Sequence, residues 1–378
     1  MKILQITSHL NVGGITRYVL SVSSALIQRG HDVAIAADAG TCGAEASQRG
    51  AAVWPVPLHT SVEFSPKVCR ATRELTRRLR REEPVDVIHA HTRVAHVVAD
   101  RLSRRLSIPY VTTWHGFFRP NLGRWLWPCT GGLTIAISEP VRQHLLKDFH
   151  VPEARIRLIP HGINPTPFEA SIDPAQLQRL RAHVGLPSGG PVIGTVARLV
   201  PSKGVHQLLE ALPHVRAVMP NARLLIIGDG EDRARLQRLA DALRISDAVH
   251  FAGALPQTAA ALRLMDLFVF LPAEQEGFGL SLLEAMASAR PIVAVRRGGG
   301  STWVLEQSGV GTLVEPNDPR GLASAILQTL QHGETASRAA DRARAIVKER
   351  YTLTRMVEQV EAVYHDVTST NCELRVEK

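Results

Sequence analysis

Hydrophobic positions along the chain follow two alternating periods. Short apolar runs rich in β-branched residues are followed by turns and then by segments with the apolar spacing of a helix. Each half opens this way: a strand at 2–8, a glycine turn and a helix near 16–29, then a strand at 192–196, a loop and a helix near 205–218. Further strands are predicted at 32–36, 85–90, 110–113, 133–137, 224–227, 267–271, 291–295 and 311–314. This alternation predicts doubly wound α/β units, in which parallel sheets are covered by helices on both faces.

The domain organisation follows from the length and from one stretch rich in proline and glycine. At 378 residues the chain exceeds the roughly 150 residues of a typical single domain, so we expect two domains. The breaker-rich stretch lies between 162 and 191, which predicts a Rossmann-like domain over 1–170, a linker over 171–190 and a second Rossmann-like domain over 191–350. Ligands of open α/β sheets bind outside the carboxyl ends of the strands, so two facing domains predict an active site in the cleft between them.

The composition excludes several classes of protein. Apolar residues make up 45% of the chain and charged residues 21%, which is a globular mix rather than a disordered one. No apolar run approaches the roughly 18 residues that cross a bilayer, and the first apolar stretch is too short for a signal peptide. The four cysteines lie far apart in the sequence, so we expect reduced thiols in a cytoplasmic protein rather than a disulfide framework.

The charge of the chain indicates an anionic partner. Lys plus Arg total 44 against 35 Asp plus Glu, and division at residue 165 gives 21 against 12 in the first part and 23 against 23 in the remainder. The basic run 67–81 includes Arg77, Arg78, Arg80 and Arg81. Such a run is either a solvated helix face or a contact for an anionic membrane surface or lipid-linked acceptor. The sequence contains no recognisable nucleic-acid-reading motif, so we expect no nucleic-acid partner.

A second cluster combines aromatic and basic residues within 14 positions. It contains Trp114, Phe117, Phe118, Arg119, Arg124, Trp125 and Trp127. Aromatic rings beside arginines are typical of a membrane interface or an acceptor site. Packing in the core is the alternative, because tryptophan is usually largely buried.

The most specific chemical signal is a glycine-rich turn that enters a helix at 276–287. Backbone N–H groups at a helix start, together with the helix dipole, favour an anion or a hydroxyl group. Glu276 precedes the turn and Glu284 follows two helical turns later, so both carboxylates can point toward one ligand. The alternative for Glu276 alone is an ordinary acidic residue near a helix start.

Several motifs occur together in the order of one known family. Glu276 and Glu284 form an E-x7-E pattern, which follows the glycine pair Gly13-Gly14, V-T-T-W-H-G at 111–116, I-P-H-G-I at 159–163, G-T-V-A-R-L-V-P-S-K-G at 194–204 and I-I-G-D-G at 226–230. Over nearly its whole length the chain resembles the retaining GT-B glycosyltransferases of family four, the glycosyl transferases group 1. The resemblance implies two Rossmann-like domains facing across a cleft and a C-terminal helix, within 351–378, that crosses back to the first domain.

The resemblance also implies roles for individual residues. Arg198 and Lys203 would hold the donor diphosphate, Glu284 the ribose hydroxyls and Glu276 the donor sugar. Gly14 would allow the backbone to approach the phosphates closely. His115 and Glu276 are the predicted catalytic residues, with His115 orienting the sugar or the acceptor. The remaining predicted donor contacts are the glycine-turn residues Gly277, Phe278, Gly279 and Leu280.

No metal or other cofactor is expected. His89 and His91 alternate along one strand and with His96 could bind zinc, but no third ligand has a convincing spacing, which favours a polar lining of the cleft. No D-x-D triplet is present, so cations and helix ends must neutralise the donor phosphates. The segment 298–303, G-G-G-S-T-W, departs from the Gly-Gly and Pro-Glu pattern of the family, and its contacts stay unassigned.

These features predict a metal-independent, retaining hexosyltransferase. It would move a sugar from a UDP- or GDP-sugar to a glycan or lipid-linked acceptor, in cell-surface polysaccharide, lipopolysaccharide or glycolipid biosynthesis, peripherally at the inner face of the plasma membrane. The alternatives are a nucleotide-sugar epimerase, a synthase that uses a soluble sugar phosphate, and an inactive GT-B partner subunit.

Overall fold

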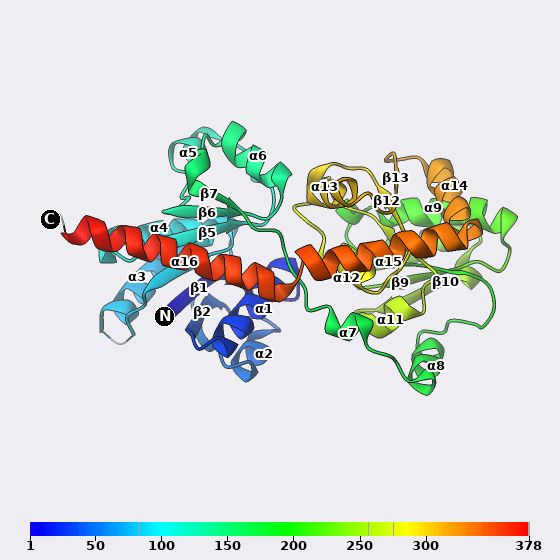
Figure 1. Ribbon diagram of the computed structural model, residues 1–378, viewed down its shortest axis with the longest axis horizontal. Coiled ribbons are helices and arrows are strands. Elements are labelled where there is room, and N and C mark those ends of the chain that lie inside the picture. The colour runs from blue at the N-terminus through cyan, green and yellow to red at the C-terminus, as the bar shows by residue number, and fades with distance from the viewer. Residues whose placement is uncertain (82, 256, 275, 377–378) are drawn as a thin grey trace. The chain divides into compact units, whose positions relative to one another are not determined.

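The chain forms two compact units, Met1–His161 with Leu353–Lys378 and Gly162–Thr352. The computed structural model describes residues 1–81, 83–255, 257–274 and 276–376 (Figure 1). Residues 377–378 of the predicted tail lie outside the described residues. The first unit ends after His161, earlier than the predicted residue 170, and the predicted linker 171–190 belongs to the second unit.

The first unit is built on a parallel seven-stranded sheet in the order β3-β2-β1-β4-β5-β6-β7. Its strands are β1 Lys2–His9, β2 Asp32–Asp38, β3 Ala52–Pro55, β4 Val87–Ala90, β5 Tyr110–Trp114, β6 Leu133–Ala136 and β7 Ile156–Leu158. Its helices are α1 Gly14–Gln28, α2 Gly43–Gln48, α3 Pro66–Arg81, α4 Arg93–Leu106, α5 Leu122–Leu126, α6 Glu139–Asp148 and α16 Leu353–Val376.

The two faces of this sheet carry separate cores, because successive side chains of a strand point to opposite faces. Ile3 of β1 packs with Val19 of α1 and Val360 of α16, whereas Leu4 packs with Leu75 of α3 and with α4. Figure 1 shows α16, coloured red, lying among the blue elements from the start of the chain. The last helix therefore completes the core of the first unit, and it contacts α1 and β5.

The second unit is built on a parallel six-stranded sheet in the order β10-β9-β8-β11-β12-β13. Its strands are β8 Val192–Val196, β9 Arg223–Ile227, β10 Val249–Gly253, β11 Leu267–Phe270, β12 Ile292–Val295 and β13 Thr312–Val314. Its helices are α7 Thr166–Glu169, α8 Pro174–His183, α9 Val205–Val218, α10 Arg233–Ala242, α11 Ala259–Arg263, α12 Leu280–Ala287, α13 Gly299–Ser308, α14 Pro319–Gln331 and α15 Gly333–Arg350. Helix α8, inside the predicted linker, packs on α11.

The strand predictions missed β3, β7 and β10. All three lie at an edge of a sheet, where a strand has only one neighbour. β3 ends in a proline and β7 has three residues, so neither carries the long apolar run of a central strand. The remaining predicted strands coincide with observed ones to within two residues at each end.

The charge of the chain divides less sharply between these units than between the predicted halves. Because α16 carries more acidic than basic residues, the first unit has 24 Lys plus Arg against 17 Asp plus Glu. The second unit has 20 against 18. Most of the positive excess, but not all of it, therefore belongs to the first unit.

Candidate active site

Each unit places its predicted catalytic and donor-binding residues at the carboxyl edge of its own sheet. In a doubly wound sheet, loops diverge where the strand order reverses, and this switch point is where ligands bind. The switch lies between β1 and β4 in the first unit and between β8 and β11 in the second. Gly14 follows β1 and His115 follows β5, whereas Lys203 follows β8 and Glu276 follows β11.

In the second unit, the switch point brings a cation and a carboxylate together. Lys203 Nζ donates to Glu276 Oε2 in an ion pair, although 73 positions separate the two residues. Both side chains are 18% exposed, so the pair is accessible from solvent. Arg198, in the same loop as Lys203, is exposed. Lys203 and Glu276 were predicted to hold different parts of a donor, and here they contact one another.

The loop that carries Arg198 is held by the predicted strand turn at 226–230. The backbone N–H of Leu199 donates to Asp229 O at 2.9 Å, and that of Asp232 donates to Leu199 O at 2.9 Å. A Cβ at Gly228 would lie 1.9 Å from Ala197 O, so this turn can reach the loop only with glycine. These backbone contacts hold the loop in place next to Arg198.

The glycine-rich turn of the E-x7-E segment leads into α12. Gly279 has a φ of 102°, a left-handed conformation that favours glycine. The Phe278 ring is buried, 5.9 Å from the ring of Tyr351. Only the backbone of Phe278 is therefore placed to contact a ligand, and its side chain belongs to the core of the unit.

The unassigned glycine segment at 298–300 packs directly on that turn. A Cβ at Gly299 would lie 2.3 Å from Glu276 O, and one at Gly300 would lie 1.9 Å from Gly277 O. The N–H of Gly300 donates to Glu276 O at 3.0 Å. The departure from the family pattern thus coincides with a close backbone contact that fixes the position of Glu276.

Glu284 lies on α12, where it is 6% exposed. Thr258, just before α11, donates its hydroxyl to Glu284 Oε2 at 2.8 Å. Thr258 was not among the predicted site residues. Its only signal was its place after a strand, at the edge where the other site residues lie, and that strand was itself missed.

In the first unit, the glycine turn starts α1. A Cβ at Gly14 would meet no atom within 4 Å. Packing within the protein therefore does not require glycine at this position, in contrast with Gly299 and Gly300. The contact of Gly14 with a donor stays a prediction.

His115, which is partly exposed, lies beside several buried imidazoles. His91 Nδ1 is 3.2 Å from His115 Nε2, and His115 Nδ1 is 3.3 Å from His161 Nε2. The ring of Tyr18 lies edge-on against that of His115, with centroids 4.7 Å apart. Both ring nitrogens of His115 are therefore engaged by protein, and its contact with a sugar stays a prediction.

Burial keeps these imidazoles neutral. It lowers the pKa of His89 and of His161 to about 3. The pKa values of His91 and His115 are also lowered well below the ordinary value, first by burial and then by the neighbouring histidines. At neutral pH the cluster carries hydrogen-bonding groups without charge.

His89 and His91 lie on one face of β4, as alternation predicts, with ring centroids 4.1 Å apart. His96 instead packs against Trp114, at 5.9 Å between centroids, on α4. Burial lowers its pKa to about 3. Within the described residues, no three His, Cys, Asp or Glu side chains are grouped as a metal ion would require.

The predicted basic contact residues on α3 have different surroundings. Arg77, Arg80 and Arg81 are exposed. Arg78 instead lies over the ring of Trp54, 4.2 Å from its centroid, and pairs with Glu83 at 2.6 Å. Three of the four arginines are thus available to a partner, whereas Arg78 contacts the protein.

The aromatic and basic cluster also separates into two groups. Trp114 is fully buried, and Trp127 donates from Nε1 to Asp100 at 2.9 Å, so both belong to the core and its border. Arg124 pairs with Glu63 at 2.5 Å. The exposed members of the cluster are Arg119 and Trp125, and the neighbouring residues Leu122 and Leu126 of α5 are exposed as well.

Two family models match the chain. The model of Glycosyltransferase Family 4 matches residues 12–166, and that of Glycosyl transferases group 1 matches residues 177–346. Together they span most of both units. The chain belongs to this glycosyltransferase family.

Relatives of similar length are similar to this chain over nearly its whole length. An uncharacterized glycosyltransferase of Methanocaldococcus jannaschii is 26% identical, over 93% of this chain and 94% of that protein. A phosphatidyl-myo-inositol mannosyltransferase of Mycobacterium leprae is 28% identical, over 96% of each. The crystal structure of Anabaena HepE with UDP and glucose matches with a TM-score of 0.82 and 22% identity, over 96% of this chain and 99% of that one. The glycosyltransferase therefore has the GT-B fold that its motifs predict.

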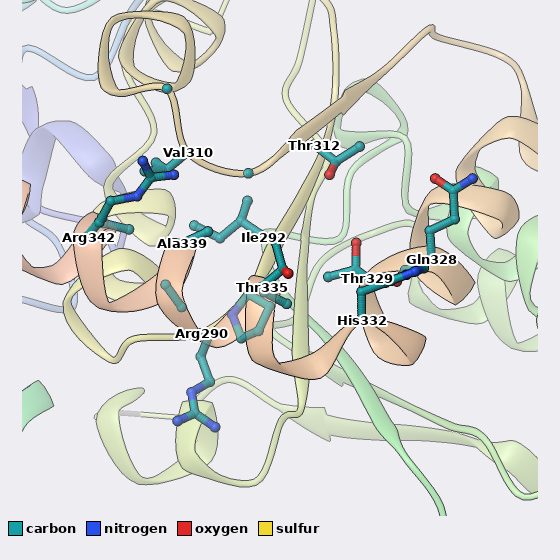
Figure 2. Close-up of a pocket in the computed structure, with 16 residues that line it drawn as sticks. Arg290, Ile292, Val310, Thr312, Gln328, Thr329, His332, Thr335, Ala339 and Arg342 are labelled. Carbon is teal, nitrogen blue, oxygen red and sulfur yellow. The ribbon is translucent and has the colours of Figure 1, made fainter.

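A cavity of about 320 Å³ in the second unit of the glycosyltransferase lies away from these residues. Figure 2 shows Ile292, Thr335 and Ala339 within it, and Thr329 and His332 beside them. Ile292 and Thr312 start β12 and β13, so the cavity lies at the amino ends of strands whose carboxyl ends lead to the site. The switch-point loops, rather than this cavity, are the candidate site.

No helix in the described part of the glycosyltransferase combines the length and the apolarity that crossing a bilayer requires.

Proposed function

We propose that this glycosyltransferase transfers a sugar from a UDP- or GDP-sugar to a glycan or lipid-linked acceptor, with retention of the anomeric configuration and without a metal ion. One observation carries the proposal: Lys203 and Glu276 meet at the switch point of the second sheet. A nucleoside diphosphate needs a cation there, and a sugar needs a carboxylate that accepts hydrogen bonds from its hydroxyl groups.

The names of similar proteins support a nucleotide-sugar donor. Anabaena HepE was crystallised with UDP and glucose and with UDP-glucose, and a relative from Mycolicibacterium smegmatis is named as GDP-mannose-dependent. These names include both UDP and GDP, so the proposal covers donors with either nucleotide.

In the second unit, Arg198 and Lys203 bind the diphosphate of the donor. Glu284, held by Thr258, accepts hydrogen bonds from the ribose hydroxyls. The N–H groups of Gly277, Phe278, Gly279 and Leu280 line the start of α12, where a helix dipole favours negative charge. When a donor binds, its phosphates compete with Glu276 for Lys203, which leaves the carboxylate to the sugar.

In the first unit, Gly14 leaves space for the phosphates beside the start of α1. His115 orients the sugar or the acceptor from the end of β5. Retention is assigned to a same-face, ion-pair-like displacement, since Glu276 is paired with a lysine and no second carboxylate is assigned as a nucleophile.

The acceptor in this proposal is carried in a membrane, and the protein contacts the anionic headgroups of that membrane. Trp125 is 48% exposed and Leu126 is 67% exposed, with Arg119 beside them. Exposed aromatic and aliphatic side chains next to arginine suit the headgroup layer of a bilayer. Arg77, Arg80 and Arg81 add positive charge at the C-terminal end of α3, about 20 Å along the helix axis from its first residue. The proposal therefore names a lipid-linked acceptor before a soluble glycan.

A donor screen tests the enzymatic proposal. The purified chain is incubated with a panel of UDP- and GDP-sugars, with and without EDTA, and the released nucleotide and the anomeric configuration of the product are measured. We expect turnover of at least one donor, undiminished by EDTA, and a product with the configuration of the donor. Inversion would contradict retention, and turnover of no donor would support an inactive partner subunit.

The product identifies the remaining rivals. An epimerase converts the nucleotide sugar without any acceptor, and a synthase of the alternative kind requires a soluble sugar phosphate as acceptor. Formation of a labelled lipid-linked product from vesicles that contain bacterial lipids would support the proposal over both. Salt-sensitive sedimentation with phosphatidylglycerol vesicles, lost after Trp125→Ser and Arg119→Ser, would support the membrane surface.

A further inference from the structure

A continuous set of hydrogen bonds joins the interior of the first unit to His115. It links Gln5 of β1, His89 and His91 of β4 and its end, His115 after β5, His161 and Tyr364 of α16. In the parallel register Gln5 lies opposite His89, and both are fully buried. The last helix of the chain therefore contributes a side chain to the surroundings of a residue more than 200 positions earlier.

The hydrogen bonds on the His115 side have one consistent proton assignment. Gln5 Oε1, an amide oxygen, can only accept, so His91 Nε2, at 2.5 Å, carries a proton and donates it. A neutral His91 then accepts at Nδ1, which requires His115 Nε2 to be the donor. A neutral His115 in turn accepts at Nδ1 from His161 Nε2. His115 is thereby held as the Nε2–H tautomer.

The hydrogen bonds on the other side of Gln5 agree with this orientation of its amide. Gln5 Nε2 donates to Tyr364 Oη at 3.1 Å, so the Tyr364 hydroxyl is free to donate to His89 Nδ1 at 2.6 Å. His89 then donates from Nε2 to Thr113 Oγ1 at 2.7 Å. If the Gln5 amide were reversed, every proton in the set would have to reverse with it. Gln5 and Tyr364 therefore couple the tautomer of His115 to that of His89, so neither ring can change tautomer alone.

We propose that Gln5 and Tyr364 are positioning residues that hold His115 in its Nε2–H tautomer for sugar transfer. The inference rests on the proposed function, because it assigns these two residues to the site that His115 marks.

The residues joined by these hydrogen bonds are buried, and packing alone does not explain why they are polar. Gln5, His89 and Tyr364 are fully buried, and His91 is 1% exposed. A buried polar side chain contributes little net stability even when it is hydrogen-bonded, and apolar residues of the same shape would fill the space at least as well. Burial lowers the pKa of His89 to about 3, which keeps the ring neutral, as the assignment requires.

Nitrogen NMR of the histidine rings tests the tautomer directly, without any substrate. The chain is labelled with 15N-histidine, and the His115 signals are assigned by their loss in His115→Asn. In the wild type we expect a protonated Nε2 and an unprotonated Nδ1. Tyr364→Phe removes one hydroxyl, and Gln5→Met removes the amide at similar volume. Both should convert His115 to a mixture of tautomers and lower kcat about five- to tenfold with little change in the KM for the donor.

Tyr110→Phe is the matched control. It removes another buried hydroxyl of the first unit, which donates to Asp100 at 3.0 Å and does not belong to the set. It should cost similar stability and leave both the His115 signals and kcat unchanged. Wild-type His115 signals in Tyr364→Phe and Gln5→Met would overturn the inference. It would also be overturned if these two variants changed the tautomer of His115 but had the same kcat as Tyr110→Phe. If no nucleotide sugar is turned over by the wild type, the proposed function fails, and the NMR result alone still decides whether the set fixes the tautomer.

Discussion

The two switch points of this glycosyltransferase use opposite chemistry. In the first unit, the residues around His115 are buried, neutral imidazoles joined to one another and to Gln5. In the second unit, Lys203 and Glu276 form a partly exposed ion pair, with the exposed Arg198 nearby. A charged pair in contact with water can exchange partners when an anion arrives, whereas a dry neutral cluster is held in one arrangement by its own hydrogen bonds. This contrast agrees with the roles in the proposed function, in which the second unit binds the charged donor and the first unit supplies fixed geometry.

The largest expected difference between the two regions is in acid stability, because acid should destabilise the histidine-rich first unit. The histidines of the first unit have lower pKa values folded than unfolded, so the unfolded chain binds more protons and stability is lost as the pH falls from 6.5 toward 3. At pH 5 each of His89, His96 and His161 should cost on the order of 2 kcal/mol relative to neutral pH. Together these losses are comparable with the whole stability of a typical domain. Urea unfolding monitored from pH 8 to pH 4.5 measures the effect.

His96→Leu sharpens the acid prediction. His96 packs against Trp114 and has a pKa of about 3, but it is not among the residues joined to His115. Its removal should reduce the proton uptake on unfolding by about one and leave the His115 tautomer unchanged. Unchanged pH dependence in this variant would contradict the assignment of acid loss to buried histidines.

The ion pair of the second unit should dominate catalysis. Glu276→Gln and Lys203→Met should each lower kcat/KM about 100-fold. Each substitution removes a group proposed to bind the donor, and it leaves the other residue of the pair without an opposite charge. The double variant should lose much less than the product of the two single losses, since the residues contact each other. Steady-state kinetics with the preferred donor measure this coupling.

The control for this pair is another ion pair of the same unit. Arg296 and Glu306 are bonded to each other at sites that are 44% and 50% exposed. Arg296→Met and Glu306→Gln should leave kcat/KM within twofold of the wild type, because they are not among the residues assigned to the site. Loss of activity as large as that of Glu276→Gln would show that the effect is not specific to the switch point.

The glycines of the two regions should respond differently to alanine. Gly14→Ala meets no atom within 4 Å, so folding stability should be unchanged while kcat/KM falls about tenfold through contact with the ligand. Gly299→Ala would place a Cβ 2.3 Å from Glu276 O at a φ of 71°, and should cost about 1–3 kcal/mol of stability. Chemical denaturation and donor kinetics, measured together, distinguish the two. Full activity of Gly14→Ala would contradict a close ligand at that turn.

The smallest difference lies within the basic helix α3. Arg78→Ala should destabilise the first unit by about 1 kcal/mol, because it removes the contact with the ring of Trp54. Arg77→Ala should change stability by less than about 0.5 kcal/mol and should weaken only vesicle binding. Equal unfolding midpoints for the two variants would show that the Trp54 contact contributes nothing measurable.

Much of the fold was predictable because local pattern and tertiary structure agree in the central strands. β11 is buried along its whole length and carries an uninterrupted apolar run, and β1 and β8 are mostly apolar with a few buried polar or small residues, so all three show in the sequence. The edge strands β3, β7 and β10 lacked such a run and were missed. Thr258 was missed for the same reason, since its place in the site depends on β10.

Side-chain partners were less predictable than positions. Arg77 and Arg78 are neighbours in one basic run, yet one faces solvent and the other lies over Trp54. Trp125 and Trp127 are two residues apart, yet one is exposed and the other donates to Asp100. A helix turns by about 100° per residue, and which face meets the core depends on elements distant in sequence.

By itself, the sequence determined the alternation of strands and helices, the two Rossmann-like units and the ordered motifs of the glycosyltransferase family, because periodicity and turn residues act over short distances. Only the tertiary structure decided that Lys203 contacts Glu276 across 73 positions, and that Tyr364 and Gln5 are joined to His91 and His115. Parallel sheets bring together the ends of strands that are far apart along the chain, and burial then turns those neighbours into hydrogen-bond partners.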